Sequence, residues 1–283
     1  MTASREITLR PAAATPQALS AYGTLLSATF EPSPKFAADA LAWRYRDNPA
    51  GEVVGTDAWS GDDLAAHYVT CPAPIRLAGR DARGLLSLNT ATHPDFQGRG
   101  LFVQLAEQTY ERGAAAGFDG VFGVANANST PGFVRRLGFQ LVQPLDAGIL
   151  LTAPRRPAAA ELGFEGAWDA PRLAWRLANP AGRYRVGRSG DLAAVWSPTH
   201  LPLVHCAAFL QTAPQATAGP PLGAQLFIGL DPRLRSAGLR LAPLPDRLRP
   251  SPLNLIYRPL AAGAPARLEP DQVALNFLDF DPY

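Results

Sequence analysis

The spacing of apolar residues changes several times along the chain, and each change predicts a different element. Residues 7–12 (ITLRPA) alternate apolar and polar side chains, which is typical of a half-buried strand. Thr15 and Pro16 then mark a helix start, because threonine caps helices and proline fits their first turn. The apolar stripe that follows at helical spacing consists of Leu19, Tyr22, Leu26 and Phe30.

Helix-like and strand-like patterns continue to about residue 140. A helix is expected within residues 36–51, and Asn48-Pro49 stops it because the residue before a proline avoids helical geometry. The other predicted elements are strands at 63–79 and 84–93, a helix at about 100–116 that ends at Gly117, a strand at 120–126 and a helix at 130–138. This order predicts a mixed α/β layer fold.

The composition is that of a globular protein with one or two domains. The chain has 283 residues, 47% of them hydrophobic and 18% charged, and can bury a large core. A net charge of +2, with Lys35 the only lysine and the arginines scattered, predicts no nucleic-acid partner. The first residues lack the apolar core of a signal peptide, and no apolar run reaches the roughly 18–20 residues of a membrane span. We therefore expect a soluble, cytoplasmic protein without a membrane partner, whose oligomeric state is left open.

Cysteine and histidine spacing predicts neither a disulfide framework nor a metal site. Cys71 and Cys206 lie far apart in the sequence and are expected to be small core residues. The chain has four histidines, namely His67, His93, His200 and His205. Their spacing with cysteine is not that of metal ligands, so no metal is expected.

Gly98 and Gly100 lie where a predicted strand turns into a predicted helix. Residues without side chains let the backbone approach a ligand, and the free N–H groups of the first helical turn bind anions such as a pyrophosphate. Taken alone, the two glycines favour an ordinary tight turn over an anion site.

The residues around these glycines carry a resemblance. The stretch THPDFQGRGLF resembles the acyl-CoA loop of the GNAT acyltransferase superfamily, and its pattern falls on Gln97, Gly98, Arg99, Gly100, Leu101 and Phe102. The opening ITLRPA and the later NANSTPGFVRRLGF are similar to the first strand and to the Asn-containing turn and helix of that family. The resemblance covers residues 5 to about 150 and implies a mixed-sheet α/β (α+β) GNAT fold that binds acetyl-CoA or another acyl-CoA.

The resemblance also implies a site and a reaction. In GNAT enzymes two strands separate and the pantetheine arm lies between them like an added strand. Backbone groups at Ala91 and Thr92 would hold that arm, and the other cofactor-binding residues implied are Asn126, Asn128, Ser129 and Phe133. A primary amine of a small molecule would then attack the thioester carbonyl directly, with a backbone N–H as oxyanion donor. The alternative is a non-catalytic acyl-CoA-binding or scaffold protein.

The chain departs from the family pattern at its proton-transfer positions. Val134 stands where many GNAT enzymes have a tyrosine acid, and Ser87 and Asn89 stand where others have a glutamate base. His67 and His93 are the candidate catalytic residues, although a hydrogen-bonded core histidine and a turn residue are at least as compatible with their settings. For Asp279 and Asp281 we favour a solvated strand end over a catalytic role.

Two sequence patterns recur about 130 residues apart. LAWRYRDNPAG (41–51) is followed by LAWRLANPAG (173–182), and GDDLAAHY (61–68) by SGDLAAVW (189–196). They predict two tandem copies of one fold, namely a catalytic acyl-CoA-binding domain at 1–155 and a degenerate GNAT-like domain at 156–283. Between Phe209 and Leu226 the second copy has only a Pro- and Gly-rich stretch, so it is expected to lack the pyrophosphate loop.

Overall fold

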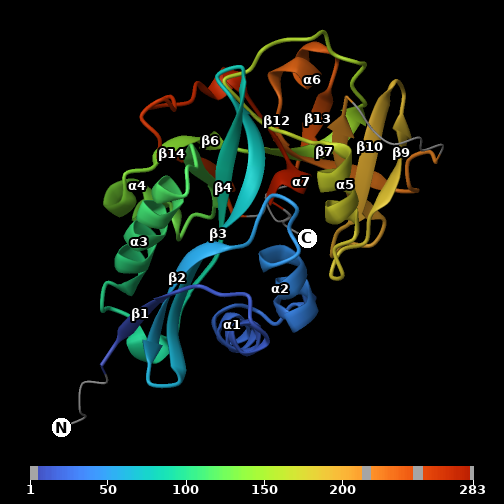
Figure 1. The fold of residues 1–283 in the computed structure, drawn as a ribbon. Helices are drawn as coiled ribbons and strands as arrows, with labels where there is room; N and C mark the ends of the chain where they lie inside the picture. The colour runs from blue at the N-terminus through green and yellow to red at the C-terminus, as the bar shows by residue number, and fades with distance from the viewer. Residues whose placement is uncertain (1–5, 212–217, 245–250, 281–283) are drawn as a thin grey trace.

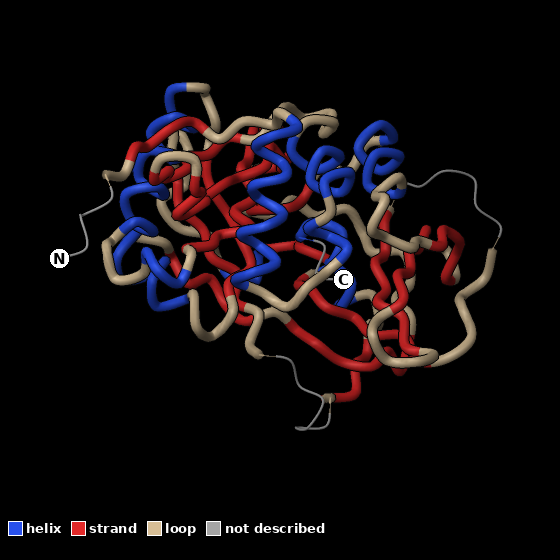
Figure 2. The backbone as a smooth tube through the Cα atoms, turned by 90° about the horizontal axis from the view of Figure 1, so that it is seen from below, coloured by secondary structure: helices blue, strands red, loops and turns tan. Residues whose placement is uncertain are grey.

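The computed structural model describes residues 6–211, 218–244 and 251–280 (Figure 1). Up to residue 144 the elements are β1 (Thr8–Pro11), α1 (Pro16–Thr29), α2 (Ala38–Tyr45), β2 (Val54–Ser60), β3 (Asp63–Leu77), β4 (Arg80–Thr92), α3 (Leu101–Ala115), β5 (Gly120–Ala125), α4 (Thr130–Leu137) and β6 (Gln140–Pro144). The later elements are β7 (Asp146–Thr152), β8 (Phe164–Gly166), α5 (Ala170–Leu177), β9 (Arg185–Ser189), β10 (Leu192–Pro198), β11 (Val204–Leu210), β12 (Ala224–Leu230), α6 (Pro232–Ser236), β13 (Arg240–Pro243), β14 (Asn254–Pro259), β15 (Val273–Asn276) and α7 (Phe277–Phe280). Strands run through the middle of the molecule and helices flank them (Figure 2).

The helix signals read from the sequence hold locally. Thr15 caps α1 by accepting a hydrogen bond from the Ala18 N–H at 3.3 Å, and the predicted stripe is buried at Leu19, Tyr22 and Leu26. Phe30 is the exception, because α1 ends one residue earlier and its ring is 43% exposed. The end of α4 is set by Gly138, whose φ of 68° lies in the left-handed region that glycine adopts freely.

The first sheet has the strand order β1-β2-β3-β4-β5-β14-β6. Its neighbouring strands are antiparallel except β4 and β5, which are parallel and joined through α3, as a crossover requires. α3 and α4 pack on one face of this sheet, and α1 and α2 pack on the other (Figure 1). The mixed-sheet α/β fold predicted from the sequence is confirmed.

Later strands repeat the order that begins at β2, as β9-β10-β11-β12-β7-β13, and are called the second sheet here. β8 and β15 pair between β3 and β12 and so join the two sheets into one continuous sheet. Here too the neighbours are antiparallel except one pair, β11 and β12, which occupy the places of β4 and β5. The strand that follows β6 in the chain, β7, belongs to the second sheet, whereas β14 crosses back between β5 and β6 of the first. Each sheet therefore contains one strand from the other side of residue 155, namely β14 in the first sheet and β7 in the second. The domain boundary at residue 155 remains a prediction.

The recurring LAWR segments meet where the two halves of the chain join. The rings of Trp43 and Trp175 are stacked 4.4 Å apart, and each indole N–H donates to the other tryptophan's backbone carbonyl, at 2.9 and 3.1 Å. Asn48 and Asn179 play matching local roles, because each side chain accepts the backbone N–H two residues later at 3.0 Å. These contacts are reciprocal, as at a two-fold interface between equivalent segments.

The second sheet differs from the first between its parallel strands. The described residues between β11 and β12, namely 211 and 218–223, contain no helix comparable to α3. Strand pairing of β11 with β12 stops at Cys206 and Leu226, and β15 then pairs with the end of β12. α7 continues from β15 and packs its buried Phe277 and Leu278 against residues of β11 and β12. The chain's own C-terminal segment therefore fills the place that remains open in the first sheet.

Candidate functional site

The candidate site begins where the parallel strands of the first sheet separate. β4 and β5 are paired as far as Ser87 and Gly123, after which β4 continues to Thr92 without a partner on that side. An unpaired strand edge offers backbone N–H and C=O groups to an extended ligand. Thr92 is half-buried and Ala91 is buried, and both lie on the free part of β4.

The glycine loop lies at the far end of this gap. Gly98 and Gly100 have φ angles of 74° and 73°, in the left-handed region that glycine adopts freely. No atom lies within 4 Å of a Cβ placed on Gly98, so position 98 requires glycine because of its backbone conformation and not because of lack of space. The Gly100 carbonyl accepts the N–H groups of Val103 and Gln104, which sets the start of α3 at Leu101. The N–H groups of the first helical residues consequently point out of the helix start, as in an anion site.

The polar side chains of the loop bind the loop itself. Gln97 Nε2 donates to the Thr92 carbonyl at 3.4 Å, and Arg99 Nη2 donates to the Asp95 carbonyl at 3.4 Å. The Arg99 guanidinium also lies 5.0 Å from the centre of the Phe96 ring. These contacts stabilise the loop, so an anion at this position would meet mainly its backbone N–H groups.

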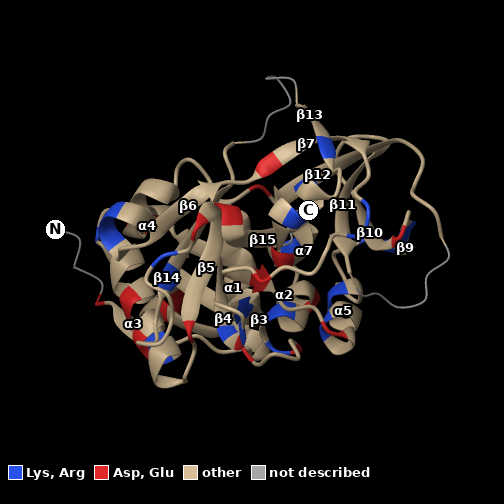
Figure 3. Ribbon diagram, turned by 90° about the horizontal axis from the view of Figure 1, so that it is seen from above, with Lys and Arg blue, Asp and Glu red and all other residues tan. Residues whose placement is uncertain are grey.

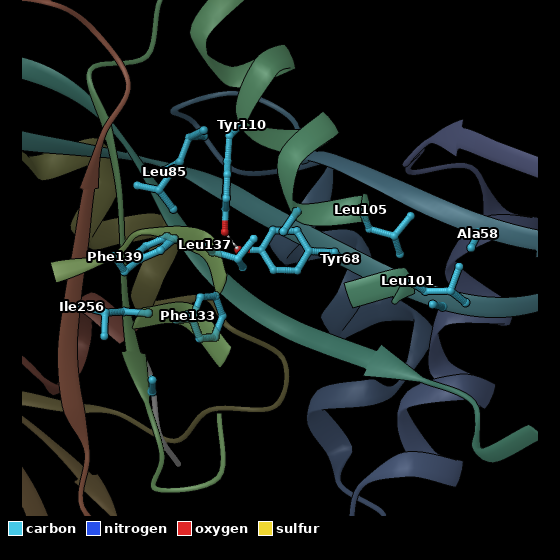
Figure 4. Packing of buried hydrophobic residues seen from close by; sticks show 14 of the residues in the cluster. Ala58, Tyr68, Leu85, Leu101, Leu105, Tyr110, Phe133, Leu137, Phe139 and Ile256 are labelled. Carbon is cyan, nitrogen blue, oxygen red and sulfur yellow. Dashed lines mark hydrogen bonds between the residues drawn. The ribbon is translucent and has the colours of Figure 1, made fainter. Parts of the chain in front are cut away.

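Leu101 and Phe102 anchor the start of α3 in the core. The Phe102 ring meets the Phe133 ring edge-on at 5.3 Å and the Tyr68 ring at 6.0 Å. A Cβ on Gly132 would lie 3.1 Å from the Phe102 ring, so α4 makes room for it with a glycine. Phe133, predicted as a cofactor contact, is buried in this aromatic cluster (Figure 4).

The turn after β5 uses its asparagine to start α4. Asn126 Oδ1 accepts the N–H groups of Asn128 and Ser129 at 3.0 and 2.9 Å, and it also accepts the Ser129 hydroxyl. Asn254 of β14 donates to the Thr130 hydroxyl beside this turn. Asn126 and Asn128 are exposed and Ser129 is half-buried, so the turn is accessible from the gap side while the Asn126 oxygen is already engaged.

Hydroxyl groups line the root of the gap. The Tyr68 hydroxyl lies 2.6 Å from the Tyr110 hydroxyl (Figure 4). It also lies 2.9 Å from Ser87 Oγ. Burial raises the pKa of Tyr68 to about 12, and burial likewise raises the pKa of Tyr110, so both phenols are neutral donors near neutral pH. Val134, half-buried on α4, provides no acid. Tyr110 was missed in the sequence because its spacing on α3 is also that of an ordinary core residue.

His67, a predicted catalytic residue, is fully buried in a hydrogen-bond chain. Its Nδ1 lies 2.6 Å from Asp57 Oδ1, and its Nε2 lies 3.2 Å from the Tyr45 hydroxyl. Asn89 Nδ2 donates to the same hydroxyl at 2.8 Å. Direct contact between His67 and a substrate is therefore closed off, and the chain reaches the gap only through Asn89. No sequence spacing linked these residues, because they lie on separate elements.

His93, the other predicted catalytic residue, caps the short turn that leads to the glycine loop. Its Nδ1 accepts the Asp95 N–H at 3.3 Å, and its ring packs edge-on against Phe96. The backbone N–H of His93 donates to the Ala65 carbonyl at 2.9 Å, which ties the turn to β3. These contacts are those of a turn residue.

The expectation for Asp279 was wrong. Its side chain is only 1% exposed on α7, where its carboxylate accepts the Trp168 indole N–H at 3.0 Å and the Asn276 N–H at 2.9 Å. Burial raises its pKa, and Arg172 at 3.7 Å opposes that shift. A buried carboxylate needs such partners, which a solvated strand end would not provide. Asp281 lies outside the described residues.

Basic and acidic side chains are interspersed over the elements (Figure 3), in keeping with the net charge of +2. Across the described parts of the chain, no helix is both long and apolar enough to cross a membrane. The same residues contain no cluster of histidine, cysteine, aspartate and glutamate that could hold a metal ion.

Comparison with known proteins relates this geometry to a family. A family model for the acetyltransferase (GNAT) domain matches residues 10–142, which hold the first sheet's strands up to β6, the gap and the loop. This part of the chain is therefore similar to the GNAT acetyltransferase domain. A search of curated proteins finds no match to the sequence.

Solved structures share the fold over most of the chain. A GCN5-related N-acetyltransferase from Kribbella flavida is 14% identical with a TM-score of 0.61, over 90% of this chain and 72% of that one. A GCN5-related N-acetyltransferase from Anabaena variabilis is 10% identical with a TM-score of 0.58, over 90% and 73%. A conserved protein of Enterococcus faecalis is 8% identical with a TM-score of 0.58, over 90% and 73%. The fold of most of this chain therefore recurs in these structures.

Proposed function

We propose that the protein is an N-acyltransferase that moves an acyl group, in the simplest case acetyl, from acyl-CoA to a primary amine of a small molecule. The observation that carries this proposal is the combination of a free β4 edge with a glycine loop at a helix start. The free edge of β4 fits an extended pantetheine arm. The glycine loop, which follows β4 and precedes α3, fits the pyrophosphate at the other end of that arm. The GNAT similarity of residues 10–142 supports acyl transfer in general.

The residues proposed to bind acyl-CoA lie along this path. Ala91 and Thr92 offer backbone groups to the arm, residues 97–102 form the pyrophosphate loop, and the turn of Asn126, Asn128 and Ser129 lines the opposite wall. Phe133 supports that wall from within the aromatic cluster rather than from its surface. A ligand class with an extended amide arm and a diphosphate fits these groups.

The proposed reaction is a direct displacement. The amine nitrogen attacks the thioester carbonyl carbon, a C–N bond forms, the C–S bond breaks, and CoA leaves as a thiolate that takes up a proton while the nitrogen loses one. The CoA thiol resembles cysteine, with a pKa of about 8.5, so its thiolate leaves with little help from an acid. Ser87, hydrogen-bonded to Tyr68 at the root of the gap, is placed to donate to the departing sulfur. The amine enters as its neutral fraction, since His67 is enclosed and His93 is bound in a turn.

A second candidate is a non-catalytic acyl-CoA-binding protein, favoured by the valine at position 134 and by the lack of a carboxylate at positions 87 and 89. The same experiment separates the two. Full-length protein is titrated with acetyl-CoA by calorimetry, and CoA release is then measured with a panel of primary amines. Binding with turnover supports the enzyme, binding without turnover of any amine supports the second candidate, and absence of binding at millimolar acetyl-CoA refutes both.

A further inference from the structure

The part of β4 beyond Ser87 contains a β-bulge, and Asn89 lies within it. The register between β3 and β4 shifts between His67 and Val69, where one strand accommodates extra residues as a β-bulge. Asn89 lies at this bulge with a left-handed φ of 48°, a conformation that asparagine tolerates better than most residues. It is half-buried and stands two residues beyond Ser87, the last β4 residue paired with β5.

One order of donors and acceptors is consistent with every contact of the chain behind Asn89. The Asp57 carboxylate only accepts, taking the Tyr22 hydroxyl at 2.6 Å on one oxygen and His67 Nδ1–H on the other. With Nδ1 as donor, His67 Nε2 accepts the Tyr45 hydroxyl proton. The Tyr45 oxygen then accepts Asn89 Nδ2–H, which fixes the amide so that its Oδ1 faces away from Tyr45.

This chain is rigid for physical reasons. Asp57, His67 and Tyr45 are 1%, 0% and 0% exposed, and the Tyr22 ring stacks on His67 at 4.0 Å. A buried polar chain in which every member has its partner resists rearrangement, because any turn of one group leaves another unsatisfied. Burial also raises the pKa of Tyr45, so its hydroxyl stays protonated and keeps the donor order.

The face of the sheet decides which substrate meets Asn89. On the α3 face the root of the gap is filled by the Tyr68 and Phe133 rings, and the pyrophosphate loop opens α3. Asn89 instead extends to the α1–α2 face, where Tyr45 of α2 binds it. If acyl-CoA fills the gap from the loop side, the second substrate reaches the carbonyl from the face of Asn89.

We propose that Asp57, His67 and Tyr45 are positioning residues that hold the Asn89 amide so that its Oδ1 accepts an N–H of the acceptor amine beside the thioester. This inference rests on the proposed acyltransferase function. An amine bound through an N–H keeps its nitrogen lone pair free for attack on the carbonyl. Asn89 thereby acts on the amine and not on acyl-CoA, and the buried chain acts only through Asn89.

The test compares Tyr45→Phe, Asn89→Gly and the double variant in the full chain. Glycine preserves the left-handed backbone at position 89 while deleting the amide, and phenylalanine deletes only the hydroxyl that binds it. We expect each single variant to lower kcat/KM for the most active amine of the panel by about 10-fold or more, as loss of one buried hydrogen bond would. The dissociation constant of acetyl-CoA, measured by calorimetry, should change by less than about threefold because the loop is untouched.

The double variant and a matched control separate positioning from a structural role. The double variant should have the same kcat/KM as Asn89→Gly alone, because the effects of two groups that act through one amide do not add. Tyr257→Phe also deletes one buried hydrogen-bonded phenol hydroxyl, bound to the Pro265 carbonyl, and should keep full kcat/KM. Unchanged kcat/KM in Asn89→Gly, or multiplied losses in the double variant, would overturn the proposal. If Tyr45→Phe does not fold, Asn89→Gly alone decides, and failure of the wild type to bind acetyl-CoA would refute the proposed function instead.

Discussion

At the scale of single residues, backbone conformation explains the glycine loop better than side-chain chemistry does. Gly98 and Gly100 both have left-handed φ angles in open surroundings, and the loop's polar side chains are bound to the loop. A substitution that tolerates left-handed backbone but brings a negative charge should therefore remove the anion site while leaving the fold intact.

Gly100→Asp is expected to weaken CoA binding by about 100-fold or more, because a carboxylate at the helix start would repel the pyrophosphate and occupy its place. Gly190→Asp is the control, since Gly190 has a φ of 60°, has nothing within 4 Å of its Cβ position and lies in the β9–β10 turn. Calorimetry with CoA measures both variants. Equal affinities in the two would show that the loop does not bind the pyrophosphate.

Buried tyrosines give a residue-scale response to alkaline pH. Burial raises the pKa of Tyr68 and of Tyr257 to about 12, and burial also raises those of Tyr22, Tyr45 and Tyr110, against about 10 in an unfolded chain. A raised pKa means that the folded chain holds protons that the unfolded chain loses. The stabilisation is thus complete below about pH 10 and is lost as the pH rises toward 12.

Phenolate absorbance measures this directly. In strong denaturant the tyrosines should titrate together near pH 10, whereas in the folded protein most of the absorbance change should wait until unfolding at higher pH. Urea unfolding at pH 8 and pH 11 should give a smaller free energy of unfolding at pH 11. A native titration that coincides with the denatured one would contradict the burial of these phenols.

At the scale of elements, the exchange of last strands decides which segments depend on each other. β14 lies between β5 and β6, and β7 lies between β12 and β13, so each sheet contains a strand from the other side of the linker. Removal of the second half would leave β5 without its antiparallel partner and would expose the edge next to the Asn126 turn.

Splitting the chain between the exposed Ala158 and Ala159 tests this dependence. Fragments 1–158 and 159–283 are expected to assemble as a 1:1 complex when coexpressed and to bind acetyl-CoA, because both exchanged strands remain available. Fragment 1–158 expressed alone should be poorly soluble or loosely packed. Chromatography with light scattering and calorimetry measure the outcome; a monomeric 1–158 with the affinity of the full chain would show that β14 is dispensable.

At the scale of the whole molecule, the paired tryptophans join equivalent segments of the two halves. Trp43→Ala should lower the free energy of unfolding by about 3–5 kcal/mol, since it empties a buried stacked site and removes reciprocal hydrogen bonds. Trp43→Ala with Trp175→Ala should cost less than the sum of the two, because the residues are in contact. Trp59→Ala, at a half-buried site on β2, is the control and should cost less. Urea unfolding checks these values, and additive losses would contradict the pairing.

Much of the first half could be predicted because its signals are local. The Thr15 cap, the buried positions Leu19, Tyr22 and Leu26, and the glycines that end or begin helices depend on only a few neighbouring residues. The loop and its family resemblance belong to the same class, since a helix start and left-handed glycines are written in adjacent positions. The recurring LAWR segments could also be seen in the sequence, but the contact between their two tryptophan rings could not.

Contacts between distant segments could not be predicted in this way. Nothing near residue 254 indicates that it pairs with β5, and nothing near Asp279 indicates a buried site, because strand edges and buried pockets are completed by segments far away in the chain. The link from Asp57 through His67 to Asn89 is likewise spread over β2, β3, α2 and β4. The sequence alone determined the local elements, the glycine loop and the family resemblance, because short-range sterics and hydrogen bonds specify them. Only the tertiary structure decided the strand exchange and the partners of the buried polar groups, because burial brings together residues that no short-range rule connects.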